Sequence, residues 1–145
     1  MSASQSNVTK ENGEWVIDGR PREKFKLLSH HHPPNIPGKS VITLLVTLPP
    51  NAATPPHTHS GAAVLGLMVR GASLNQMNCD EPTVYREGES FYEAPGCHHV
   101  RSENVCEGPA EEASFYAVFI VDDEVVEKYG YEGLVVMDAD GGKKE

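Results

Sequence analysis

Short segments rich in β-branched and aromatic residues recur along most of this chain, and turn-forming residues separate them. Pro, Gly and Asn fill the intervals, as at Pro49, Pro50 and Asn51, where turns need restricted or positive φ. The segments that we expect to form strands are residues 15–17, 24–28, 41–48, 63–69, 73–77, 83–85, 90–93, 99–101 and 115–121. Short strands at this spacing predict an all-β chain, folded as a sandwich or a small antiparallel barrel.

The chain length and the remaining segments predict a single domain. Residues 122–129 are expected to form a short C-terminal helix, because acidic residues begin the segment and Gly130 ends it. Residues 1–12 are polar without apolar periodicity, which predicts a flexible arm. We therefore expect one barrel domain over residues 13–140, followed by a tail at 141–145. A chain of 145 residues can bury one core and hold one pocket.

Charge and cysteine content restrict the partners and the compartment. The chain has 21 Asp and Glu against 12 Lys and Arg, a net charge of -9, which repels nucleic-acid phosphates and anionic lipids. No apolar run approaches the ~20 residues of a membrane helix. From the charge and from this missing run, we expect neither nucleic acid nor membrane as a partner. Three irregularly spaced cysteines predict free thiols in a reducing compartment, and hence a cytoplasmic protein.

Two histidine-containing segments carry residue types that bind metals. On an extended backbone, His57 and His59 point to the same face, about 6.6 Å apart along the strand. Further along, a turn at Gly96 is expected to return His99 antiparallel to the strand that carries Glu93, so that one hairpin presents both side chains to the interior. Imidazole binds Zn, Fe, Ni, Mn and Cu, so the pattern predicts a divalent transition metal without selecting one.

These two segments resemble the motifs of the small single-domain cupins. The first cupin motif, G(x)5HxH(x)3-4E(x)6G, is similar to residues 52–71, where His57 and His59 match the HxH and Gly71 the closing glycine. The second, G(x)5PxG(x)2H(x)3N, is similar to residues 88–104, where Gly88, Gly96 and His99 match, whereas the proline and the asparagine each come one place late. The resemblance covers about residues 40–121. It implies an antiparallel cupin barrel, that is, a double-stranded β-helix or jelly roll, with His57, His59 and His99 as metal ligands.

The chain departs from the cupin pattern at the glutamate of the first motif. That ligand would fall at Ala63 or Val64, neither of which can bind a metal. Glu93 is the first candidate to replace it, as ligand or general base, because an unpaired buried carboxylate either takes up a cation or becomes protonated. Gln76 is the second candidate, because a hairpin around Gly71 would bring it opposite Leu65, close to the missing glutamate.

Two further residues near His99 are candidates for catalysis. Motif spacing selects His99 as the ligand, which leaves His98 at the pocket mouth or on the outer surface, where it can transfer protons. Arg101 shares the parity of His99 and can anchor a substrate carboxylate or enolate by a charge-assisted hydrogen bond. A bulge at Val100 would instead turn Arg101 outward.

The resemblance and the candidate residues together predict a metal-dependent enzyme. Three imidazoles with an open coordination position can chelate a carbonyl or enol substrate, which suits lyase, isomerase, dehydratase or cyclase chemistry. Fe or Cu in the same site would also suit a dioxygenase, and the loss of the motif glutamate suits a non-catalytic ligand-binding cupin. Apolar candidates for the pocket wall predict a small hydrophobic or aromatic substrate. Because edge-strand exchange commonly makes dimers in this family, we expect a homodimer.

Overall fold

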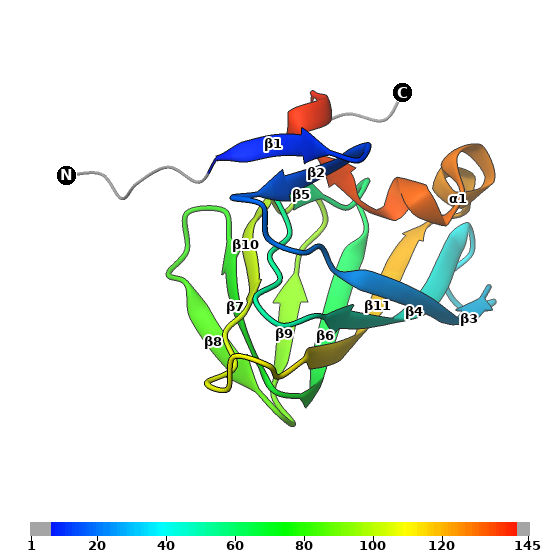
Figure 1. The fold of residues 1–145 in the computed structure, drawn as a ribbon. Helices are drawn as coiled ribbons and strands as arrows, with labels where there is room; N and C mark the ends of the chain where they lie inside the picture. The colour runs from blue at the N-terminus through cyan, green and yellow to red at the C-terminus, as the bar shows by residue number, and fades with distance from the viewer. Residues whose placement is uncertain (1–6, 142–145) are drawn as a thin grey trace.

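The computed structural model describes residues 7–141, whose strands form two five-stranded antiparallel sheets and a separate hairpin (Figure 1). In spatial order, the first sheet contains β12 (Val136–Met137), β5 (His57–Thr58), β10 (His99–Asn104), β7 (Ala72–Met77) and β8 (Thr83–Arg86). The second contains β3 (Lys24–His31), β4 (Lys39–Leu48), β11 (Ala113–Asp122), β6 (Ala63–Arg70) and β9 (Ser90–Glu93). This arrangement confirms the expected antiparallel barrel.

Helical structure is confined to the C-terminal end of the described residues. The helix α1 (Asp123–Tyr129) confirms the expected short helix, and two 3-10 turns follow it, η1 (Tyr131–Leu134) and η2 (Asp138–Asp140). Strand β12 lies between these turns and pairs with β5, which brings the C-terminal segment against the strand of His57. Within residues 7–141, no helix is both long enough and apolar enough to cross a membrane.

The hairpin of β1 (Val8–Glu11) and β2 (Glu14–Ile17) differs from the flexible arm expected over residues 1–12. Its turn is Asn12-Gly13, and both residues have positive φ, at 51° and 80°. Asn-Gly is the preferred pair for a two-residue hairpin turn, so this signal outweighs the polar composition of the segment. Residues 1–6 of the expected arm and 142–145 of the expected tail lie outside the described residues.

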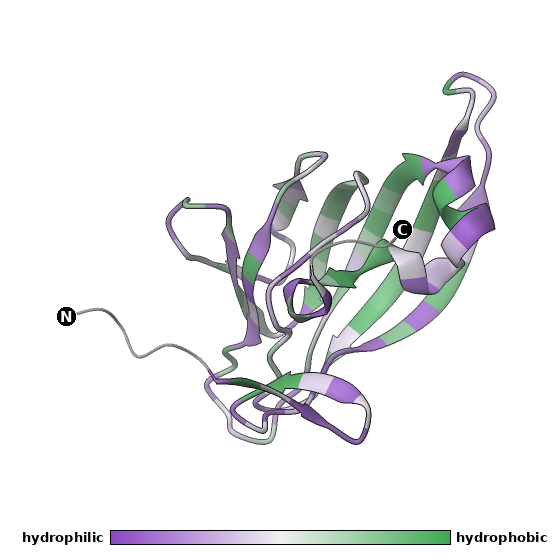
Figure 2. Ribbon diagram, turned by 90° about the horizontal axis from the view of Figure 1, so that it is seen from above, coloured by the Kyte–Doolittle hydropathy of each residue, from purple (hydrophilic) through white to green (hydrophobic). Residues whose placement is uncertain are grey.

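The core fills the space between the two sheets. Along β4 and β11, buried and more exposed residues alternate, as expected for strands with one face inside, and Figure 2 shows the resulting bands of hydropathy across the ribbon. Ile42 and Leu48 are fully buried on the inner face of β4. On β6, Val64 and Met68 point inward, whereas Leu65 and Leu67 lie on the outer face and are each 46% exposed.

Two glycines permit close approaches that a side chain would prevent. A Cβ atom at Gly66 would come within 2.3 Å of the Phe91 ring, so glycine leaves room for this ring, which belongs to its register partner on β9. Gly71, between β6 and β7, has a φ of 75° and lies against Cys106. Its turn passes the chain from the second sheet to the first, because β6 and β7 do not pair with each other.

Candidate metal centre

The side chains of His57, His59 and His99 converge in the barrel interior. His57 begins β5 and His99 begins β10, and these two residues are register partners in the first sheet. His59 follows β5 directly and points the same way as His57. One ring nitrogen from each histidine lies within 4.8 Å of the other two, and all three residues are buried. This grouping agrees with the three ligands expected from the cupin motifs.

Backbone carbonyls fix which nitrogen of His57 and His59 carries hydrogen. The Nδ1 of His57 lies 2.7 Å from the carbonyl oxygen of Pro55, and the Nδ1 of His59 lies 2.8 Å from that of Leu134. A carbonyl can only accept, so each Nδ1 donates and each Nε2 keeps a lone pair. Burial lowers the pKa of His57 well below its usual range, and the adjacent His59 and His99 lower it further, so the His57 ring is neutral at pH 7.

Asn75, which the sequence analysis did not single out, fixes the ring of His99. Its Oδ1 lies 2.8 Å from the Nε2 of His99, while its Nδ2 donates to the hydroxyl of Ser73 at 2.9 Å. The amide oxygen therefore faces His99, whose Nε2 donates and whose Nδ1 keeps the lone pair. The alternation of polar residues in β7, with Ser73 and Asn75 on one face, is the signal that could have identified this residue.

The structure contradicts Gln76 as a ligand. The expected hairpin does not exist, because β6 and β7 belong to different sheets and Gln76 is the register partner of Arg101 in β10. One residue after the inward-facing Asn75, Gln76 has the opposite parity. Its amide nitrogen donates to the backbone oxygen of Asp80 at 3.0 Å, outside the barrel interior.

Glu93 reaches the three histidines from the opposite sheet. It ends β9, which pairs with β6, whereas His99 begins β10 in the other sheet, so the hairpin expected to join them is wrong. The barrel nevertheless brings them together: the Oε1 of Glu93 lies 3.0 Å from the Nε2 of His59 and 3.2 Å from the Nδ1 of His99. Glu93 is 2% exposed, so this carboxylate is inside the barrel, as expected.

The charge state of Glu93 calls for a cation at this point. Burial by itself would raise the pKa of Glu93, but hydrogen bonds and charge interactions with His59 and His99, which require an extra proton on the facing ring nitrogens, outweigh it and hold the pKa below its usual range. The His59 Nε2 and Glu93 Oε1 atoms are both buried, and neither has a hydrogen-bond partner among the described residues. Two facing acceptors need a positive species between them, either an extra proton or a metal ion.

A metal ion fits the donor set better than a proton does. One ring nitrogen from each of the three histidines belongs to a single group, and the Oε1 of Glu93 contacts two of these rings, at the Nε2 of His59 and the Nδ1 of His99. Donors bound to one ion at about 2.0–2.2 Å lie about 3 Å apart when they are adjacent, which matches the two contacts of Glu93. The other ring nitrogens are held by oxygen acceptors, the arrangement typical of metal-ligating histidines. The residues present therefore fit a divalent transition metal.

A small pocket opens at these four residues, and its volume is about 400 Å³, including the open space at its mouth. We call it the metal pocket. Its other polar residues are Glu23, Thr54 and Ser102, and its wall is apolar, with Phe25, Val46, Leu48, Val64, Phe115, Ala117, Phe119 and Val135. Sequence reasoning missed Glu23, because the surrounding segment Arg22–Lys26 has no motif or periodicity that marks it as interior.

The carboxylate of Glu23 is held rigidly at the pocket wall. Its Oε1 accepts from the Nε of Arg22 at 2.8 Å and from the hydroxyl of Thr54 at 2.6 Å, and its Oε2 accepts from the second guanidinium nitrogen at 2.8 Å. Burial lowers the pKa of Arg22, but the contacts with Glu23 outweigh it and raise that pKa overall, so the guanidinium keeps its charge beside this carboxylate.

Comparison with known proteins agrees with the fold. The family model described as the cupin domain matches residues 44–119, more than half of the chain. The chain belongs to the cupin family. A search of curated proteins finds no match to this cupin.

Solved structures similar to this cupin share its fold at low sequence identity. KdgF from a Halomonas species has a TM-score of 0.56 and 18% identity, with 74% of this chain and 87% of that chain covered. The cupin domain of Schizosaccharomyces pombe Cnp3 has a TM-score of 0.58 and 16% identity, covering 81% and 78% of the two chains. An RmlC-like cupin from Methanocaldococcus jannaschii has a TM-score of 0.55 and 14% identity, covering 87% and 99%.

The position where the cupin motif has its glutamate lies beside Glu93 in the second sheet. Val64 is seven residues before Gly71, as the motif requires, and it points inward with 1% exposure. Its register partner on β9 is Glu93. Directly paired residues of antiparallel strands point to the same face with Cβ atoms about 4.5–5.5 Å apart. The carboxylate that contacts the histidines therefore lies on β9, one strand away from the β6 position of the motif.

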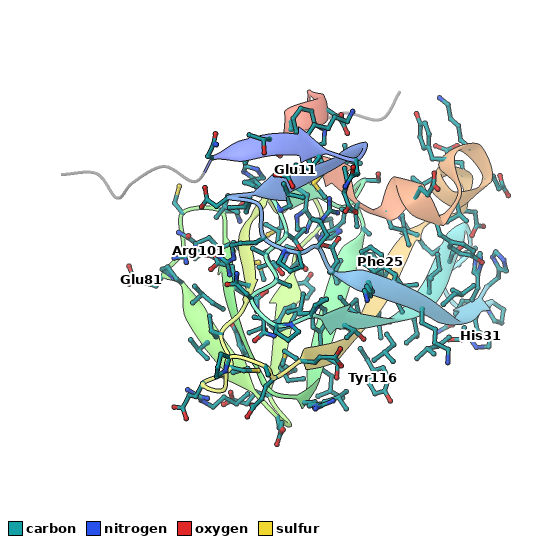
Figure 3. The ribbon with its side chains drawn as sticks, in the orientation of Figure 1. Glu11, Phe25, His31, Glu81, Arg101 and Tyr116 are labelled. Atoms are coloured by element: carbon teal, nitrogen blue, oxygen red, sulfur yellow. The ribbon has the colours of Figure 1, made fainter. Side chains whose placement is uncertain are left out.

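His98 and Arg101 do not line the metal pocket: His98 lies at the surface, one of the two places expected for it, and Arg101 takes the outward orientation expected if β10 has a bulge. His98 is half-exposed and pairs with the carboxylate of Asp138. The register of β10 shifts between His99 and Arg101, the bulge that the sequence left open, and Arg101 therefore points outward and donates to Glu103 at 2.8 Å. Figure 3 labels Arg101 on the left of the molecule, beside the strands of the first sheet.

Proposed function

We propose that this cupin is a metal-dependent enzyme that acts on a small carbonyl or enol substrate. The observation that carries the proposal is the convergence of three buried imidazoles, from His57, His59 and His99, with the buried Oε1 of Glu93 in contact with two of them. That oxygen and the Nε2 of His59 have no hydrogen-bond partner among the described residues. A binding protein without metal would gain nothing from keeping Glu93 buried against two imidazoles. We expect Zn, Fe, Ni, Mn or Cu as the ion.

The charges of the pocket suggest the form of the substrate. A divalent ion with one ionised carboxylate leaves one net positive charge, since the ion pair of Glu23 and Arg22 is neutral. Such a site favours a ligand with one negative charge, such as an enolate or a monocarboxylate. When bound, the ion would act as a Lewis acid toward a substrate oxygen. The apolar wall excludes water and strengthens the electrostatic contacts inside.

In this proposal Glu93 serves as a ligand, and Glu23 is the remaining carboxylate that can accept a substrate proton. Glu23 lines the same pocket, and the contacts with Arg22 and Thr54 keep its carboxylate in one orientation. Proton transfer beside a polarised oxygen suits isomerisation, dehydration, decarboxylation or cyclisation. A cytoplasmic homodimer stays a prediction from the sequence.

Metal content and turnover of two variants test the proposal. Protein purified without a tag and without chelator is analysed for metals, beside His57→Ala and the control Gln76→Ala. We expect one transition-metal ion per chain in the wild type and the control, and a large loss in His57→Ala. A panel of small oxo and hydroxy acids is then followed by NMR with each metal-loaded protein. Absence of metal from the wild type, or equal turnover in His57→Ala, would contradict the proposed function.

A further inference from the structure

A second, more apolar cavity adjoins the metal pocket on the inner side of the second sheet. Its volume is about 890 Å³, including open solvent at its mouth, and we call it the apolar groove. Along β4 the inward-facing residues Leu48 and Val46 line the metal pocket, and the next inward residue, Leu44, lines the groove. Inward residues follow one another at about 6.6 Å along a strand, so the two cavities are consecutive sections of one surface.

Two residues form the boundary between the cavities and line both of them. They are Phe25 on β3 and Val135, between η1 and β12. Phe25 is the register partner of Val46, and Leu27 is the register partner of Leu44, so both β3 side chains share the inner face. Figure 3 shows Phe25 beside β3, below the C-terminal segment that closes the other side.

The groove leaves large apolar side chains in water on an inner face. Phe25 is 47% exposed and Leu27 is 45% exposed. Leu134 and Met137, from the C-terminal segment, are buried at the opposite wall. An apolar surface that continues directly from a polar donor site has the composition of an extended small-molecule site, with the polar groups at one end to fix orientation.

We infer that the substrate has a metal-chelating head and an apolar tail, and that the tail lies in the apolar groove past Phe25 and Val135. This inference rests on the proposed function, because the head is held by the metal centre. The continuity of the two cavities through shared residues selects a tail of the same ligand over a separate partner. The groove extends the metal pocket by one inward-facing position of β4, and a tail of several methylenes or an aromatic ring matches this added length.

Hydroxamates of increasing chain length test the inference, because a hydroxamate chelates a divalent ion through two adjacent oxygens. The wild type is loaded with Co²⁺, and dissociation constants are measured from the visible spectrum for acetohydroxamate, butanohydroxamate, hexanohydroxamate and octanohydroxamate. Each methylene that enters the groove is expected to strengthen binding about threefold to fourfold. Octanamide, which lacks the chelating head, is expected to bind weakly and without a spectral change.

A matched pair of variants locates the tail. Leu27→Gln places a polar group in the groove and is expected to weaken octanohydroxamate about fivefold, with acetohydroxamate unchanged. Leu67→Gln is the control, because Leu67 has nearly the same exposure but lies on the outer face of β6. If the protein binds Co²⁺ and acetohydroxamate but has the same affinity for every hydroxamate of the series, the groove inference alone is overturned. Equal loss in both variants, or self-association that blocks long hydroxamates, would also overturn it, whereas failure to bind Co²⁺ would overturn the proposed function.

Discussion

Exchanging the residues of one cross-strand pair tests whether Glu93 replaces the motif glutamate. The single variant Glu93→Val removes the carboxylate, and the double variant Val64→Glu/Glu93→Val returns it at the position where the cupin motif has it. The two residues are register partners, and they are 1% and 2% exposed on the same inner face. The double variant therefore keeps the composition of the pair and moves the carboxylate by one strand.

The structure predicts opposite effects of Glu93→Val on metal affinity and on the stability of the metal-free protein. Loss of a residue that hydrogen-bonds a metal ligand typically weakens metal binding 10–100-fold. Loss of a ligand itself, as in Glu93→Val, should weaken metal binding by at least about 100-fold, or ~2.7 kcal/mol. Without metal, Glu93 is a buried carboxylate with an unpartnered oxygen. Without the carboxylate, the histidine rings can release their extra proton, so Glu93→Val leaves no unpaired buried charge. Replacing buried charges by apolar groups of similar volume is then often stabilising by about 1–4 kcal/mol, so the metal-free variant should unfold at a higher denaturant concentration.

The assay combines chelator competition for Zn²⁺ or Co²⁺ with urea unfolding of the metal-free proteins. We expect the double variant to recover most of the affinity that Glu93→Val loses, because its carboxylate starts from a Cβ about 5 Å away and faces the same histidines. The reasoning is refuted if Glu93→Val binds metal as tightly as the wild type. It is also refuted if metal-free Glu93→Val is several kcal/mol less stable, since Glu93 would then be a structural partner of the histidines.

Three further predictions concern residues that the site and the fold depend on. Asn75→Ala should weaken metal binding about 10–100-fold by releasing the ring of His99, whereas Gln76→Ala should leave it unchanged, as measured by the same chelator competition. Glu103→Gln should destabilise the protein by about 1 kcal/mol at pH 7. Burial would raise the pKa of Glu103, but its two arginine partners lower it overall. The stability that the Glu103 carboxylate contributes is therefore complete above its unfolded pKa and disappears as pH falls through its folded pKa. Urea unfolding at pH 7 and pH 3 should show that the stability difference between wild type and Glu103→Gln shrinks at the lower pH. Gly66→Ala should cost about 1–3 kcal/mol in urea unfolding, because its methyl group would overlap a buried aromatic ring.

Much of the fold could be predicted from the sequence because its signals are local. Alternating strands and their turn residues depend on neighbouring residues only, and so do the HxH pair and the helix boundary at Gly130. The Asn12-Gly13 hairpin was equally local, and polar composition obscured it. By contrast, β12 is two residues long and forms only because it pairs with β5, far away in sequence.

The site was harder to predict than the fold because it depends on which strands pair. Glu93 was assigned to the interior correctly, but through a hairpin that does not exist, since parity alone placed the side chain. The same kind of hairpin reasoning gave the wrong residue in β7, where a shift of one position separates Gln76 from Asn75. Glu23 lies in the pocket only because β3 pairs with β4 along the barrel wall, which no pattern around residue 23 indicates.

The C-terminal segment connects the metal centre to the apolar groove. The backbone oxygen of Leu134 holds the ring of His59, while the Leu134 side chain lines the groove and Val135 lines both cavities. This segment follows the part of the chain that matches the cupin domain, which ends at residue 119. A shift of η1 that widens the groove must therefore also move the acceptor of His59. We expect ligands that fill the groove to alter metal affinity, and the metal to alter their binding by the same factor, because coupling between two sites is reciprocal.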